Sequence, residues 1–218
     1  MEIDNKFVSI VVIGNFNPAI LDAKFLKDVC MIPIGDVKKE SVTPVQSRVD
    51  CENISFVANL DLFKIVHNDI VNFAKSKIPS YLDMYLNKLQ HTPINACGIN
   101  FNIDISETNR KKIEEHFVND RSSLLGIVKA KSVIIGNMTA YDNKGGSEVI
   151  QYSIGYEIEE QTVLNRIMIE KKNELIFNMN YNYEIRNLRQ NRERIKMLTE
   201  KYEERFEEYQ IFVKKVLS

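Results

Sequence analysis

The stretch Val11-Val12-Ile13-Gly14-Asn15-Phe16 decides how we expect this chain to fold, because its pattern returns as Val133-Ile134-Ile135-Gly136-Asn137-Met138, 122 positions later. A second run, Ile54 to Leu62, aligns with Leu175 to Tyr183 at a displacement of 121 positions. Similarity at a nearly fixed spacing is the signature of a duplicated structural unit. The sequence therefore predicts two related β-rich halves, residues 1–121 and 122–218, within one compact domain.

The composition sets the class of protein. The chain has 218 residues, of which 44% are hydrophobic and 27% are charged, as is usual for soluble globular proteins. Its formal net charge of -1 gives no overall field that would attract nucleic acid or an anionic membrane. The first apolar run, Phe7 to Ile13, is too short for a secretory signal or a membrane span. We therefore expect a cytoplasmic protein.

The spacing of apolar residues predicts the secondary structure. The expected strands are 7–13, 45–49, 54–66, 99–105, 126–138 and 150–158. A break near 59–61 could split the strand at 54–66 in two. Two further strands, 164–169 and 174–185, are expected to form a hairpin around Lys171-Lys172-Asn173. The expected helices are 20–29, 69–89 with Pro79 kinking it or beginning a second helix, a bridging helix to about 118, and 186–217. These elements predict an α+β fold, in which an antiparallel sheet is covered on one face by the long helices.

The last predicted helix has an apolar residue at every seventh position. These residues are Leu188, Ile195, Tyr202, Tyr209 and Val216. Such spacing fits a dimeric coiled coil or a helix that packs across its own sheet. Tyrosine is bulky for a two-stranded seam, and polar residues occupy the second seam position, so the sequence favours packing on the sheet.

No residue pattern predicts catalysis. The chain has no phosphate-binding loop and no Gly-x-Ser-x-Gly turn. Cys30, Cys51 and Cys97 have no C-x-x-C spacing, so we expect reduced thiols, no metal and no cofactor. Asp61, His67 and Asp69 could meet near one strand end, as acid-base catalysis needs, although a polar turn explains them as well. We therefore expect a protein that is not an enzyme.

Two groups of polar residues are candidates for binding. The first comprises amides and carboxylates that alternate with apolar residues on predicted strands: Asn59, Asp61, Asn100, Asn102, Asp104, Asn178, Asn180 and Asn182. Their side chains can donate and accept hydrogen bonds. The second is the basic start of the last helix: Arg186, Arg189, Arg192, Arg194 and Lys196. It could bind phosphates or another anionic partner. A solvent-exposed sheet face and a solvated helix face are the alternatives.

The stretch His91 to Phe101, which reads HTPINACGINF, carries a family resemblance. Together with the order of the predicted elements, it resembles a sporadically distributed group of uncharacterised bacterial proteins, often found in mobile or phage-defence loci. In that group a Gly-x-x-Tyr/Phe strand follows the first long helix, and Gly98 to Phe101 match this motif. The chain departs from the group in lacking a closing strand after its last helix. The resemblance implies two half-repeats and no particular reaction.

These observations predict a non-catalytic binding or assembly subunit, belonging to a bacterial defence system if the resemblance holds. We expect its partner to be another protein or a second copy of the chain. The alternative is a nucleic-acid or nucleotide sensor that uses the basic start of the last helix, with binding that weakens steeply as salt is added.

Overall fold

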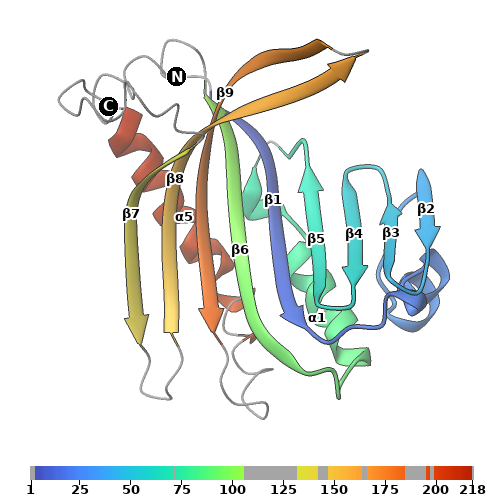
Figure 1. Cartoon of the computed structure of the whole chain (residues 1–218). Helices are drawn as coiled ribbons and strands as arrows, with labels where there is room; N and C mark the ends of the chain where they lie inside the picture. The colour runs from blue at the N-terminus through green and yellow to red at the C-terminus, as the bar shows by residue number, and fades with distance from the viewer. Residues whose placement is uncertain are drawn as a thin grey trace.

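A single antiparallel sheet forms the body of the molecule. The computed structural model describes residues 3–70, 72–105, 132–141, 147–163, 166–184, 195–196 and 199–217, and side chains at 7–70, 72–102, 195–196, 199–211 and 214. Within these residues nine strands lie in the order β2-β3-β4-β5-β1-β6-β9-β8-β7 (Figure 1). The bounds are β1 Ile3–Gly14, β2 Lys39–Val42, β3 Gln46–Asp50, β4 Ile54–Asn59, β5 Leu62–Asn68, β6 Ile94–Ile105, β7 Ser132–Tyr141, β8 Ser147–Val163 and β9 Arg166–Glu184. The predicted α+β class is confirmed.

Strand β1 lies inside the sheet, as its β-branched run predicts. It pairs with β5 on one side and with β6 on the other. Val8, Ile10 and Val12 are fully buried on one face. The strand ends at Gly14, whose N–H donates to the carbonyl of Asp61 at 2.9 Å.

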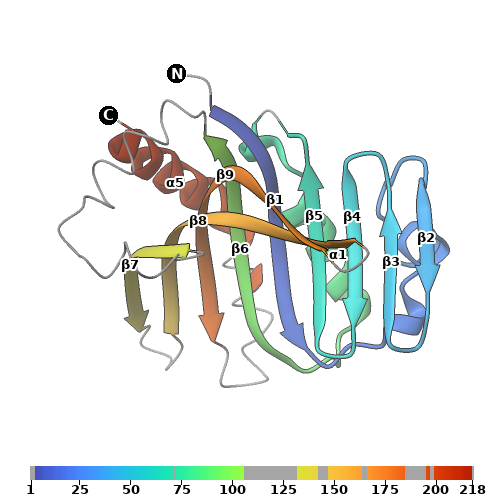
Figure 2. The same ribbon diagram turned by 45° about the horizontal axis from the view of Figure 1, so that its top comes forward.

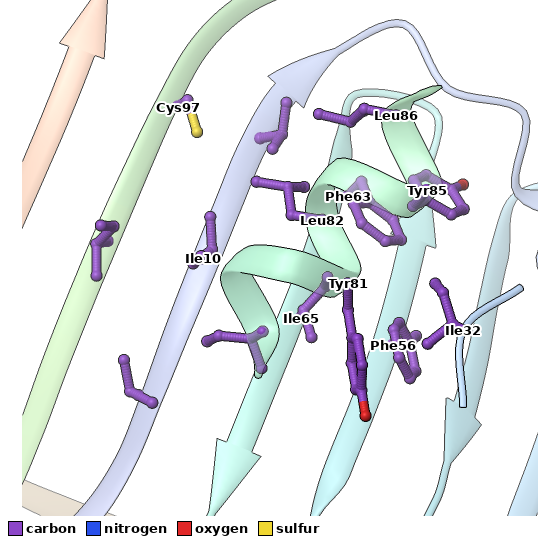
Figure 3. Packing of buried hydrophobic residues seen from close by; sticks show 14 of the residues in the cluster. Ile10, Ile32, Phe56, Phe63, Ile65, Tyr81, Leu82, Tyr85, Leu86 and Cys97 are labelled. Carbon is purple, nitrogen blue, oxygen red and sulfur yellow. The ribbon is translucent and has the colours of Figure 1, made fainter. Parts of the chain in front are cut away.

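Helix α1, Ile78–Lys88, packs on the buried face of β1 and β5. Pro79 stands in its first turn, where proline costs no hydrogen bond, so this residue begins the helix and does not kink it. The rings of Tyr85 and Phe63 stack with centroids 3.8 Å apart. Figure 3 shows Tyr81, Leu82, Tyr85 and Leu86 directed from α1 toward the sheet.

Helix α5, Tyr202–Leu217, lies behind the sheet in Figure 1, on the same side as α1. The ring of Tyr209 in this helix stacks on Phe101 of β6, with the ring centroids 5.2 Å apart. Thr199, just before the helix, donates to the carboxylate of Asp83 in α1 at 3.4 Å. These contacts place the described part of the last helix against β6 and α1, which is the packing that the sequence favours. The coiled-coil alternative stays a prediction.

Several predicted elements differ from the observed ones. The helix predicted at 20–29 is a 3-10 turn, η1 Pro18–Ile20, followed by a π turn, η2 Phe25–Val29. The helix predicted at 69–89 is reduced to the 3-10 turn η3, Phe73–Lys75, and α1. The alternative of a split strand over 54–66 is confirmed, because β4 and β5 form a hairpin. The predicted helix after 105 lies outside the described residues.

The second half departs further from the sequence pattern. Strand β9 runs unbroken through 171–173, so the hairpin predicted around these lysines is wrong; the observed hairpin joins β8 to β9. A register shift between Tyr156 and Glu157 marks the irregularity there. The two copies of the hexapeptide take different places: the first ends the internal strand β1, whereas the second lies in β7, which pairs with β8 alone in the described sheet. The duplication therefore stays a prediction.

Candidate functional site

Strands β6 and β9 bring the amide-bearing positions together. Asn100 pairs with Asn180, Asn102 with Asn178, and Gly98 with Asn182. Ser9 of β1 lies on the other side of Asn100 and accepts a hydrogen bond from its Nδ2 at 3.5 Å. Successive residues of a strand alternate between faces. Asn100, Asn102, Asn178, Asn180 and Asn182 therefore occupy one face as neighbours; this set is called the amide row below.

Asn102 is the buried member of the amide row. Its side chain is only 4% exposed, and its Oδ1 has no hydrogen-bond partner in the described part of the chain. Leaving a buried acceptor unpaired costs about 1–3 kcal/mol. Asn100 beside it is half-buried. The protein encloses this oxygen, so Asn100 is the described side chain of the amide row that remains partly accessible.

The other predicted members of this group lie elsewhere. Asn59 ends β4, and its Oδ1 accepts the N–H of Asp61 at 2.9 Å within the turn that leads to β5. Both residues therefore serve the β4–β5 turn and are separated from β6 by β5 and β1. They lie apart from the amide row, and their role in binding stays a prediction. Asp104 lies two residues beyond Asn102 in β6, opposite Asp4 of β1 and Ile176 of β9.

The basic group is described at one residue only. Arg186, Arg189, Arg192 and Arg194 lie outside the described residues. Lys196 is exposed, and its Nζ is 3.6 Å from Glu200 Oε1 one helical turn later. An exposed pair of this kind contributes little to stability. The structure leaves the predicted anion-binding role of this group as a prediction.

A pocket that the sequence did not predict opens on the helix-covered side. It has a volume of about 250 Å³ and lies between the start of α1, residues 33–35, the β3–β4 turn and the end of β5. Its polar lining residues are Cys51, Glu52, Asn53, His67, Lys77 and Tyr81. They come from segments far apart in the chain, so no sequence motif could have indicated the pocket.

The imidazole of His67 is half-buried and lines this pocket. Its Nδ1 is 2.9 Å from Ser76 Oγ. Burial lowers the pKa of the imidazole from 6.5, so the ring is neutral near pH 7. Burial raises the pKa of the neighbouring Cys51 thiol, with Lys27 opposing the rise. The interior of the pocket is therefore polar but uncharged.

The structure does not assemble the predicted group of Asp61, His67 and Asp69. Asp61 precedes β5, and His67 is near its other end. Asp69 is exposed and has a left-handed backbone with φ 51°, as befits a residue in a tight turn. The polar-turn interpretation is therefore the better one for both aspartates.

No family model matches the chain, and no curated protein is similar to it. Among the described residues, no three His, Cys, Asp or Glu side chains are placed to hold a metal ion together. The described helices include none that combines the length and the apolar character needed to cross a bilayer.

Proposed function

We propose that the protein is a non-catalytic binding or assembly subunit, which contacts another protein or a second copy of itself through the amide row. The observation that supports this proposal is the register of β6 and β9, which sets Asn100 against Asn180 and Asn102 against Asn178. Amide side chains offer both donors and acceptors, so such a surface can match the polar groups of a protein partner.

The arrangement of the helices supports the choice of this face. Helices α1 and α5 pack on the side of the sheet that carries Val8, Ile10 and Phe101, whereas the amide row belongs to the opposite side. On that side Asn100 is half-buried, so part of its amide group is available to a partner. Figure 2 shows the β8–β9 hairpin extending across this side, near one end of the sheet.

The test compares the association of the wild-type chain with that of N100A/N180A. We expect the wild type to self-associate in sedimentation velocity, and the double variant to associate at least about tenfold more weakly, since two hydrogen bonds at about 1 kcal/mol each are lost. N95A, at an exposed position of the same strand, is the matched control. A wild-type chain that stays monomeric at about 100 µM, or an N100A/N180A variant that associates like wild type, would contradict self-assembly through the amide row.

We also propose that the subunit belongs to a bacterial defence system. This proposal rests on the resemblance to proteins of mobile or phage-defence loci with two related halves, and a co-transcribed nuclease or ATPase gene would support it. The substitutions Arg189→Glu and Arg192→Glu should leave association through the amide row unchanged. Nucleic-acid binding that these substitutions abolish, and that falls steeply with salt, would favour the sensor instead.

A further inference from the structure

The residues just before α1 hold the inner wall of the pocket in place. Ser76 Oγ lies 2.9 Å from His67 Nδ1 and accepts the N–H of Ile78 at 3.5 Å. Tyr202 of α5 donates its hydroxyl proton at 2.8 Å to the carbonyl of Phe73, in the 3-10 turn that leads to Ser76.

The contact with Ser76 leaves one ring nitrogen of His67 for a ligand. Its Nδ1 is 2.9 Å from Ser76 Oγ, outside the lining of the pocket, so Nε2 is the nitrogen available to a ligand. Each nitrogen of a neutral imidazole donates or accepts one hydrogen bond, according to the tautomer. The inner wall therefore presents one uncharged hydrogen-bonding group.

The two charged lining residues are of opposite sign. Lys77 and Glu52 are both exposed, which places them at the mouth of the pocket. Neither forms an ion pair within the described part of the chain. A ligand with both an anionic and a cationic group could pair with both residues. The volume of about 250 Å³ would hold about eight waters at 30 Å³ each, which is the size of a small metabolite.

We propose that this pocket binds a free α-amino acid with an uncharged polar side chain. The carboxylate pairs with Lys77, the ammonium group pairs with Glu52, and the polar end of the side chain forms a hydrogen bond with Nε2 of His67. Serine, threonine, asparagine and glutamine have this chemistry. The pocket lies on the helix-covered side of the sheet, so the proposal does not depend on the amide row.

The first test is calorimetric titration of the full chain with L-glutamine, L-asparagine, L-serine and L-threonine. We expect at least one to bind with a Kd below about 1 mM. The amide of that amino acid, which lacks the carboxylate, and its N-acetyl derivative, which lacks the ammonium group, should each bind at least about tenfold more weakly. No heat of binding for any of the four at about 10 mM would overturn the proposal.

Variants then assign the groups. K77E and E52K should each weaken binding of the amino acid by at least about tenfold, because each substitution reverses one charge at the mouth of the pocket. K75E changes an exposed lysine that does not line the pocket and should bind like wild type. Since all three positions are exposed, the variants should fold. Binding that K77E and E52K leave unchanged would overturn the proposal even if the amino acid binds.

The role of His67 can be measured by NMR. In ¹⁵N spectra of the labelled chain, adding the amino acid should shift the Nε2 resonance of His67, whereas the resonances of His91, which is exposed and does not line the pocket, should stay unchanged. The variant S76A, which removes the contact with Nδ1, should weaken binding of the amino acid. A His67 Nε2 resonance that the bound amino acid leaves unchanged would overturn the role assigned to this residue.

Discussion

Gly14 shows how one residue can be required by its surroundings. A Cβ atom at this position would overlap the carbonyl oxygen of Pro93, which also accepts the N–H of Asn15 at 3.0 Å. We expect G14A to lower the free energy of unfolding by about 1–3 kcal/mol, because the backbone of Pro93 has to move. Urea denaturation measures this, with G35A as the matched control, since nothing lies within 4 Å of a Cβ on Gly35. Equal stability of the two variants would contradict the close approach.

His67 should make stability depend on pH. Burial lowers its pKa from 6.5 in the folded chain, so the unfolded chain binds a proton first as the pH falls. Its contribution is fully present above about pH 6.5 and is lost as the pH falls through the lowered folded-state pKa. Urea denaturation at a series of pH values measures this effect. Between about pH 7 and pH 5 we expect the free energy of unfolding to fall less for H67Q than for the wild type. H91Q, at an exposed site, is the control. The same pH slope for wild type and H67Q would contradict the burial of the neutral ring.

Among the elements, helix α5 depends on both its rings and its hydrogen bonds. Phe101 of β6 contacts Tyr202, Phe206 and Tyr209, with ring centroids 5.2–5.8 Å apart. Heptad spacing in the sequence predicted this apolar stripe, because it depends only on the period of the helix. The partners across from it, Phe73 and Phe101, could not be predicted, since they depend on how the chain returns to β6.

Removal of the Tyr202 hydroxyl tests the docking of α5. We expect Y202F to lower the free energy of unfolding by about 0.5–1.5 kcal/mol, because one buried hydrogen bond is lost while the carbonyl of Phe73 keeps the N–H of Ser76 as a donor. Hydrogen exchange should then show α5 opening more readily than in the wild type. A double-mutant cycle between Phe101 and Tyr209 should give a coupling of about 0.5–1.5 kcal/mol beyond area burial. A coupling of zero would mean that the two rings do not pack in solution.

Local pattern also explains which elements were missed. The alternation of apolar and polar residues predicted β6, and a run of consecutive apolar residues predicted β1, because each pattern is a property of a single segment. The predicted helix at 20–29 was wrong because the chain forms a short 3-10 turn at Pro18–Ile20, capped by the side chain of Asn17, and then a π turn. Lys171, Lys172 and Asn173 suggested a turn. They lie instead in the part of β9 that pairs with β8 and not with β6, where charged residues are tolerated on both faces of the strand pair.

At the scale of the whole molecule, the candidate sites follow from how strands pair and how loops meet. The alternation in β6 and β9 predicted that amides share a face, but only the register sets Asn100 against Asn180. Alternation alone could not show that Asn59 and Asp61 lie in the β4–β5 turn, away from the amide row. The pocket needs the β3–β4 turn, residues 33–35 and α1 together. Single-sequence patterns carry no information on such long-range contacts.

The two halves should unfold as one unit, because two independent contacts join them. Strand β6 of residues 1–121 pairs with β9 of residues 122–218 over nine residue pairs, from Ala96–Glu184 to Asp104–Ile176. Helix α5 also covers Phe73 and Phe101, which belong to the first half. Separating the halves would expose this apolar surface and leave β6 with an unpaired edge. We therefore expect a single urea transition that tyrosine fluorescence and circular dichroism follow together, and a fragment 1–121 that is insoluble unless 122–218 is co-expressed. Two separate transitions, or a soluble and folded fragment 1–121, would show that the first half is a domain in its own right.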